Sequence, residues 1–252
     1  MAKSQTVMAA ANIAHRLRAA VARQPCYECP LCGRVGEFLT EALPLGDRPF
    51  AKCPRCGSLE RHRIQTLTLG RISDASWAMK RGLQFAPDPV SVVLRRLLRE
   101  LVTADIEPQG DSIHLDLRAL ELPDECFDVV FASHVLEHID DDVRALTEIK
   151  RILKPGGIAI LPVPICVEKT VEYGAPVHME HLHVRAPGMD YFDRYRAVFG
   201  RVEVFTSNDF PEKYQLWSYE DRTGYPRPEV PLRTPMAGNR HHDAVPVCYR
   251  DR

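Results

Sequence analysis

The chain has 252 residues, of which 45% are hydrophobic and 27% are charged, a balance typical of a globular protein with a sizeable core. Lysine and arginine number 33 against 34 aspartate and glutamate, which argues against nucleic acid as the main partner because phosphate binding needs a basic surface. No apolar run reaches the roughly 20 residues of a membrane-spanning helix. We therefore expect no membrane insertion and a cytoplasmic location.

The first 25 residues contain lysine and arginine but no acidic residue, and they are rich in alanine. This composition predicts an N-terminal amphipathic helix over residues 1–25. A transit peptide is the alternative interpretation, because such peptides are also basic and poor in acids.

Two Cys-Pro-x-Cys-Gly turns follow, at residues 29–33 and 53–57. In a reducing compartment, duplicated Cys-x-x-Cys pairs 20 residues apart are typical of a metal site. We expect Cys29, Cys32, Cys53 and Cys56 to hold a structural Zn²⁺ with all four positions closed, in a zinc ribbon over residues 26–60. Cys26 is an alternative ligand, and redox-active pairs are the alternative chemistry.

A helix is predicted to connect the ribbon to the rest of the chain over residues 61–80, with Ser58 as a candidate cap. Arg61, His62 and Arg63 form a basic cluster at its start. A solvated helix face is the favoured interpretation of this cluster, over contact with an anionic group of a substrate.

From residue 81 to about residue 220, short apolar stretches alternate with helical patterns. Strands are predicted at 82–86, 101–105, 113–116, 127–133 and 158–163, and helices at 90–101, 141–153 and 191–198. This alternation predicts an α/β fold with a doubly wound, mostly parallel sheet that binds its ligand beyond the carboxyl ends of the strands. Strands at 202–205 and 214–219 are expected to complete the sheet.

Residues 221–252, rich in Pro, Arg and His, are predicted to be a loosely packed or disordered tail.

Three motifs in this region together resemble class I S-adenosylmethionine-dependent methyltransferases: Phe-Asp-Val-Val at 127–130, Ser-His-Val-Leu-Glu-His at 133–138 and Leu-Lys-Pro-Gly-Gly at 153–157. The ribbon followed by Leu-Glu-Arg-His-Arg at 59–63 is similar to a bacterial subgroup with such a ribbon before its methyltransferase domain. The resemblance implies a Rossmann-like methyltransferase domain over residues 81–220 and S-adenosylmethionine as the methyl donor.

Asp105 ends the second strand, 20 residues after Phe85, the offset expected of an acid that binds ribose hydroxyls. The resemblance implies the same role for Asp105, and contacts with adenine for Asp116 and Leu117. The other predicted cofactor contacts are Phe85, Ala86, Pro87, Asp88, Ile106, Ser133 and His134. The first loop, residues 85–89, lacks the glycine that most of the family has there. A scaffold that has lost the cofactor is therefore an alternative.

Histidines and acids gather in two segments, residues 134–138 and 178–185. We predict catalytic roles, with a histidine as proton acceptor, for His134, Glu137, His138, His183 and Arg185. His178 and His181 are weaker candidates. The first segment is similar to ubiquinone-biosynthesis O-methyltransferases that hold a divalent metal, although His134 stands where those enzymes have an acid. A second divalent metal is thus a further candidate cofactor.

The sequence favours methyl transfer to a small-molecule or saccharide acceptor, on an oxygen atom. One alternative is a catalytically silent binding protein of the same fold, which the glycine-free first loop favours. Another is an RNA or protein methyltransferase that uses the ribbon to grip its substrate. The identity of the acceptor, the atom methylated and the oligomeric state are left open by the sequence.

Overall fold

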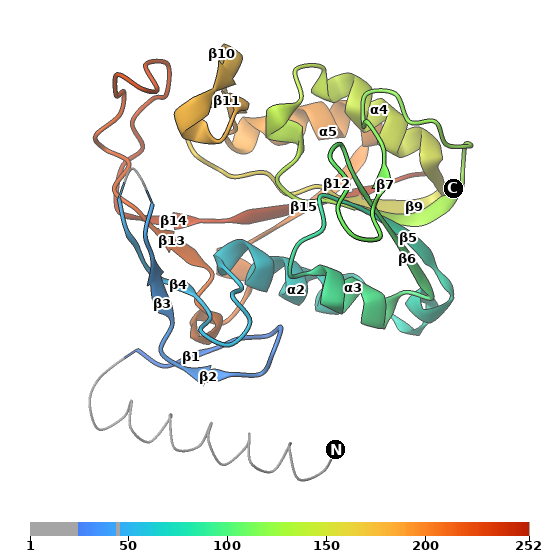
Figure 1. Ribbon diagram of the computed structural model, residues 1–252, viewed down its shortest axis with the longest axis horizontal. Helices are drawn as coiled ribbons and strands as arrows, with labels where there is room; N and C mark the ends of the chain where they lie inside the picture. Colours follow the sequence, from blue (N-terminus) through green and yellow to red (C-terminus); the bar gives the residue numbers. More distant parts are fainter. Residues whose placement is uncertain (1–24, 44–45, 252) are drawn as a thin grey trace. The chain divides into compact units, whose positions relative to one another are not determined.

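A computed structural model describes residues 25–43 and 46–251, which divide into two units (Figure 1). In the described part, unit 1 combines residues 25–71 with residues 206–221 and 239–243. Unit 2 combines residues 72–205 with residues 222–238 and 244–251. The helix expected over residues 1–25 lies outside the described residues, apart from residue 25.

Unit 1 is built from short antiparallel strand pairs and one helix. The pairs are β1 (Tyr27–Glu28) with β2 (Val35–Gly36), β3 (Leu39–Glu41) with β4 (Arg48–Lys52), and β13 (Trp217–Tyr219) with β14 (Arg240–His242). The helix is α2 (Glu60–Ile72), and two 3-10 turns, η5 (Ser207–Asp209) and η6 (Glu212–Tyr214), precede β13. Because strands of two to five residues bury little apolar surface, this unit needs stabilisation beyond a hydrophobic core.

Arg63 of α2 supplies part of that stabilisation from the centre of unit 1. Its side chain is fully buried, and its guanidinium donates hydrogen bonds to the carbonyl oxygens of Ala51 (2.8 Å), Ser58 (2.9 Å) and Gln215 (2.6 and 2.9 Å). The same group lies 4.5 Å from the ring centre of Phe38. Arg63 is therefore neither on a solvated face nor available to a substrate, and both interpretations of it from the sequence are corrected.

A seven-stranded sheet forms the centre of unit 2, with the order β12-β15-β9-β8-β5-β6-β7. Its strands are β5 (Arg81–Phe85), β6 (Glu100–Asp105), β7 (Ile113–His114), β8 (Phe127–Ala132), β9 (Leu153–Ile160), β12 (Arg201–Thr206) and β15 (Ala244–Tyr249). The five strands from β5 to β9 are parallel to their neighbours, and β15 runs antiparallel to β9. The sheet confirms the predicted α/β fold with a mostly parallel, doubly wound sheet.

Helices cover both faces of this sheet, with α3 (Ser91–Leu97) on one face and α4 (Asp142–Ile152) and α5 (Phe192–Phe199) on the other (Figure 1). The start of α4 is fixed by Asp141, whose carboxylate accepts a hydrogen bond from the backbone N–H of Arg144 at 3.1 Å. Its apolar face, with Leu146, Ile149 and Ile152, is completely buried in the core of unit 2. The amphipathic pattern in the sequence is thus the cause of the helix's position.

A smaller two-stranded sheet in unit 2 carries the second histidine segment. It pairs β10 (Val171–Val177) with β11 (His183–Ala186) in the antiparallel sense. The remaining 3-10 turns of unit 2 are η1 (Ala75–Met79), η2 (Leu136–His138), η3 (His178–Glu180) and η4 (Met189–Tyr191).

The C-terminal region differs from the sequence-based expectation. Residues 221–252 are not a loose tail, because β15 lies inside the central sheet between β9 and β12, and its residues from Ala244 to Cys248 are buried. The sequence did not predict this strand because it contains Pro246, and proline is rare in interior strands. The carbonyl of Pro246 nevertheless accepts a hydrogen bond from Leu161 N at 3.2 Å. The segment predicted as a strand at 214–219 also differs, because β13 pairs with β14 in unit 1 rather than completing the sheet.

In the part of the chain that the structure describes, no helix combines the length and the apolar character that crossing a membrane would require.

The burial of β15 makes a prediction about stability. Val247 is fully buried in this strand, whereas Val143 on α4 is 47% exposed. We expect Val247→Ala to lower the free energy of unfolding by about 2 kcal/mol, because it removes buried methyl groups and leaves a cavity. Val143→Ala should change it by less than about 0.5 kcal/mol. Urea denaturation followed by circular dichroism measures both, and equal small effects would mean that residues 244–249 are not part of the core.

Candidate active site

The carboxyl ends of β5, β6 and β8 meet at one edge of the sheet, because the three strands are parallel and β5 pairs with both of the others. At such a point the connections leave toward opposite faces and open a crevice. A cavity of about 370 Å³ lies there. It is lined by Phe85, Ala86, Asp105, Ile106, Leu115, Asp116, Leu117, Arg118, His134, Val135, His138 and Ile139.

Most of the cofactor contacts predicted from the sequence line this cavity. They are Phe85, Ala86, Asp105, Ile106, Asp116, Leu117 and His134. Pro87 lines a neighbouring polar hollow that shares Asp105 with the cavity, and Asp88 and Ser133 line neither. The Asp88 carboxylate instead accepts hydrogen bonds from Val90 N (2.8 Å) and Gln84 Nε2 (3.2 Å) at the start of α3. This geometry suits a structural role for Asp88, and its contact with a cofactor stays a prediction.

The glycine-free first loop adopts a backbone conformation that usually favours glycine. Ala86 has a φ of 47°, and its N–H donates to the carbonyl of Ala104 at 2.9 Å. On another wall of the cavity, His134 has a φ of 56°. Each such residue costs roughly 1–2 kcal/mol relative to an ordinary conformation. Two left-handed residues lining one cavity are typical of a functional site.

Two acids on the cavity wall differ in their surroundings. The Asp105 carboxylate accepts a hydrogen bond from Glu107 N at 3.0 Å and lies at the end of β6. Asp116 forms a two-pronged ion pair with Arg118, with N–O distances of 2.7 and 3.1 Å, which lowers the pKa of the Asp116 carboxyl. Arg118 was not among the predicted site residues, because a basic residue two positions after an acid looks like any solvated pair.

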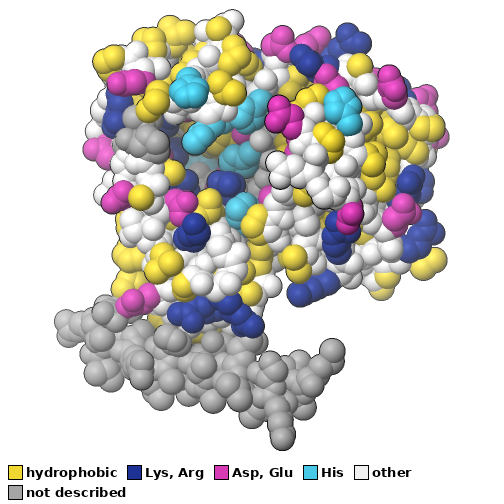
Figure 2. All heavy atoms as spheres, viewed as in Figure 1, with side chains coloured by type: hydrophobic (Ala, Val, Ile, Leu, Met, Phe, Trp, Pro, Cys, Tyr) yellow, Lys and Arg dark blue, Asp and Glu magenta, His cyan; other side chains and the backbone are white. Residues whose placement is uncertain are grey.

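The structure brings the two histidine segments together, because β11 lies against η2. The buried Glu137 carboxylate has its Oε1 atom 3.4 Å from His134 Nδ1 and 3.9 Å from His183 Nε2. The rings of His138 and His183 meet edge to face, with centres 4.7 Å apart. Histidine side chains gather on the face of the molecule drawn in Figure 2.

Burial affects the titration of these rings. It lowers the pKa of His183 to about 3, helped by the nearby His138 and His181, and it also lowers the pKa of His138. Both rings are therefore neutral near neutral pH, the form in which imidazole binds protons or metals. His178 and His181 are exposed and do not line the cavity.

Arg185 holds the two segments against each other. Its guanidinium donates to the carbonyl oxygens of Leu136 (2.9 Å), Ile139 (2.5 Å) and Asp140 (3.0 Å). It also pairs with Glu172 at 3.1 Å and Asp142 at 3.5 Å. The side chain is 3% exposed and does not line the cavity. These contacts suit a positioning role for Arg185, and its catalytic role stays a prediction.

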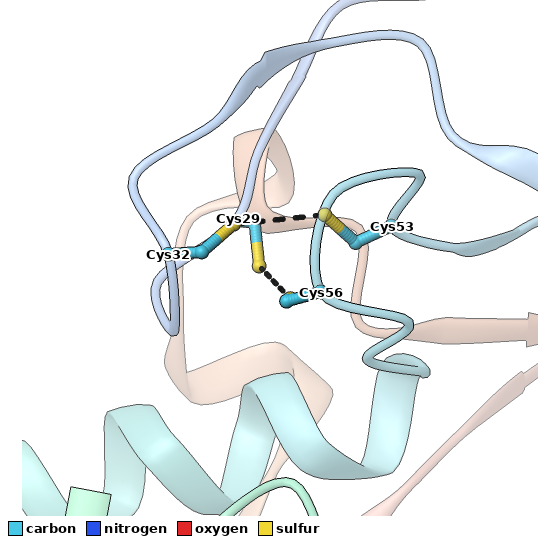
Figure 3. Close-up of side chains that lie close together, drawn as sticks. All are labelled: Cys29, Cys32, Cys53 and Cys56. Carbon is cyan, nitrogen blue, oxygen red and sulfur yellow. Dashed lines mark hydrogen bonds between the residues drawn. The ribbon is translucent and has the colours of Figure 1, made fainter. Parts of the chain in front are cut away.

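The four predicted metal-binding cysteines converge on one point in unit 1 (Figure 3). Cys29 Sγ lies 3.6 Å from Cys56 Sγ, and Cys32 Sγ lies 3.7 Å from Cys53 Sγ. Tetrahedral Zn²⁺ with bonds of about 2.3 Å requires sulfur–sulfur separations of about 3.8 Å. The donor set thus fits a closed Zn²⁺ site, and Cys26 is not among the clustered thiols.

The backbone explains why each pair is followed by glycine. In both turns the glycine N–H donates to the carbonyl of the first cysteine, at 2.8 Å for Gly33 and 2.9 Å for Gly57. Their φ angles are 70° and 71°, which a residue with a Cβ rarely adopts. The neighbouring Cys53 sulfur and burial raise the pKa of the Cys29 thiol to about 12, so metal binding would have to displace its proton.

Comparison with known proteins shows what part of the chain is similar to methyltransferases. The model of a methyltransferase domain matches residues 78–161. The chain is 36% identical over 101 residues to the probable methyltransferase ltbC of Aspergillus luteorubrus, a match that covers 37% of this chain and 34% of that protein. It is 32% identical over 90 residues to a probable S-adenosylmethionine-dependent methyltransferase of Mycolicibacterium smegmatis, covering 33% and 35%. The chain thus spans about a third of the length of these relatives.

Among solved structures, the 4+2 cyclase SpnF is similar over 98% of this chain and 96% of its own, with a TM-score of 0.52 and 16% identity. At that identity the similarity concerns the fold alone. The match to the domain model is more informative, because residues 78–161 contain β5 to β9 and every residue that lines the cavity. Residues 78–161 of this chain therefore match a methyltransferase domain, and they contain the whole lining of the cavity.

Proposed function

We propose that the protein transfers a methyl group from S-adenosylmethionine to an oxygen atom of a small-molecule or saccharide acceptor. The observation that carries this proposal is the cavity at the carboxyl ends of β5, β6 and β8, in which seven of the predicted cofactor contacts meet. Its volume of about 370 Å³ falls within the ordinary range for small-ligand sites. S-adenosylmethionine, when bound, supplies an activated methyl group.

The residues of the cavity suit the parts of this cofactor. Asp105 offers a carboxylate, which can accept hydrogen bonds from two neighbouring ribose hydroxyls at once. Ile106 and Leu117 supply apolar wall for the adenine ring, with Asp116 beside them. The left-handed conformation of Ala86 supports an intact cofactor site over a scaffold that has lost its cofactor, because the loop reaches this geometry without glycine.

His134 is the residue that we propose as proton acceptor. It lines the cavity, and the buried Glu137 carboxylate lies 3.4 Å from its Nδ1 atom. A carboxylate at this place orients the imidazole and stabilises the charge that it gains when it accepts a proton from the acceptor hydroxyl. The protein otherwise acts by positioning, since transfer of a methyl group is a displacement between two aligned partners.

The ribbon, in this proposal, holds Zn²⁺ for structural reasons. Four thiolates fill every position of a tetrahedral ion and leave none for a substrate. The cluster of side chains around them is small and consists of the cysteines with Tyr27, Leu31, Phe38 and Phe50. An ion that binds only the folded form would therefore contribute much of the folding free energy of unit 1.

Binding of S-adenosylmethionine tests the cofactor site by isothermal titration calorimetry. Asp105→Asn removes the charged acceptor and should weaken binding about 10- to 100-fold, as expected for a hydrogen bond to a charged group. The control, Asp193→Asn, makes the same change at an exposed pair with Arg196 on α5 and should bind like the parent. A parent that does not bind would overturn the proposed function, and equal binding by Asp105→Asn would move the ribose site elsewhere.

Metal analysis tests the ribbon. Cys53→Ser should reduce the Zn²⁺ content of the purified protein by one equivalent, because three thiols no longer close the site. Cys26→Ser is the matched control and should retain the full content, since Cys26 lies outside the cluster. Inductively coupled plasma mass spectrometry gives the stoichiometry. Equal zinc in the parent and in Cys53→Ser would contradict the four-cysteine assignment.

A further inference from the structure

We propose that Glu137, His138 and His183 form a second metal site, for a divalent cation, whose open coordination positions face the cavity and bind a hydroxyl oxygen of the acceptor. The choice of acceptor rests on the proposed function, whereas the metal site itself does not. The three residues belong to unit 2 and come from two segments, η2 and β11.

The donor atoms are already close together. One nitrogen from each histidine and one oxygen of Glu137 lie within 4.8 Å of one another. Two imidazoles and one carboxylate are a common donor set for divalent metals that keep positions open for water or substrate. Bonds of about 2.1 Å need donor separations of roughly 3–4 Å. The donors, which lie within 4.8 Å of one another, would therefore have to close by about 1 Å around an ion.

The charge and burial of the cluster favour a cation. The Glu137 side chain is completely buried, and burying a carboxylate costs free energy unless positive charge compensates it. Two imidazoles, those of His134 and His183, lie within 4 Å of its Oε1 atom. A divalent ion held between Glu137 and the histidines would bring positive charge next to this carboxylate.

His183 has surroundings suited to a ligand histidine. Its Nε2 atom is the one nearer Glu137, at 3.9 Å, and its Nδ1 atom lies 4.0 Å from Glu180 Oε2. Among the residues that the structure describes, Nδ1 is buried without a hydrogen-bond partner. Metal-binding histidines usually direct their second ring nitrogen toward a carboxylate. Glu180 is itself fixed by a buried ion pair with Arg233, with an N–O distance of 2.5 Å, so it can hold the ring in place.

The site lies where it can act on an acceptor. His138 lines the cavity, as does His134. A cation held by His138 therefore borders the space in which an acceptor would lie, and a hydroxyl bound to it would have a lowered pKa. This assignment separates two roles: His183 completes the metal site, and His134 remains the proton acceptor. The acceptor class that fits is a hydroxylated small molecule whose reacting oxygen can bind a cation.

Cobalt(II) alone, without S-adenosylmethionine or acceptor, tests the metal site. Protein with its ribbon loaded with zinc is titrated with Co²⁺ and followed by calorimetry and by visible absorption. We expect one equivalent to bind without the intense near-ultraviolet band that cobalt bound to thiolates would give. Glu137→Gln, His183→Gln and His138→Ala should each weaken binding at least 10-fold. His178→Ala, an exposed histidine of the same segment that lies outside the donor set, should bind like the parent.

Binding of Co²⁺ and binding of S-adenosylmethionine test the metal site and the proposed function separately. His138 is exposed, so His138→Ala keeps the test decisive even if substitution of the two buried residues unfolds the chain. A parent that binds no Co²⁺, or a His138→Ala variant that binds it unchanged, overturns the metal site. S-adenosylmethionine binding that persists in such a case leaves the proposed function standing. Binding of Co²⁺ without binding of S-adenosylmethionine would support the metal site and reject the proposed function.

Discussion

The buried guanidinium of Arg185 determines where both histidine segments lie. It binds three carbonyl oxygens of residues 136–140, so the turn that contains Glu137 and His138 is fixed to β11. His183 is two residues before Arg185 on the same strand, and residues two apart point to the same face. The hydrogen bonds of one arginine therefore set the distance between His183 and Glu137. A lysine could not replace it, because a single ammonium group lacks the planar fork needed to reach these oxygens.

The central sheet of unit 2 also helps to fix the residues that line the cavity. β5 is paired along its length with β6 and β8, so the ends of these strands have little freedom. Strain at the two loops that follow them, at Ala86 and His134, is thereby maintained by a rigid framework. Rigid strands with strained loops at their ends are a usual way to hold side chains in place before a ligand arrives.

Much of the fold could be predicted from the sequence because its signals are local. The periodicity of α4, the apolar run of β8 and the repeated cysteine turns each lie within a few residues of chain. Asp105 followed from its place at a strand end, since strand ends in a parallel sheet meet at one edge, whereas Asp116 and Leu117 were implied by the family resemblance. The structure places seven of the predicted cofactor contacts there, while their roles stay predictions.

The parts that could not be predicted depend on long-range contacts. A buried arginine such as Arg63 or Arg185 has the same sequence signature as one on the surface, because only tertiary structure provides its carbonyl partners. β15 was missed because Pro246 argues against an interior strand when its neighbours are unknown. The meeting of His183 with Glu137 joins residues 46 positions apart, and no local pattern connects them.

Unit 1 combines segments that lie far apart in the chain, and this affects the order in which its contacts can form during synthesis. The four clustered thiols lie within 28 residues of one another, between Cys29 and Cys56, so they can gather without the later segments of unit 1. Arg63, however, donates to the carbonyl of Gln215, 152 residues later in the chain. Because translation proceeds from the N-terminus, this arginine lacks one of its three carbonyl acceptors until residues 72–205 of unit 2 have been made. The four-cysteine segment is thus made before the packing of unit 1 can be completed.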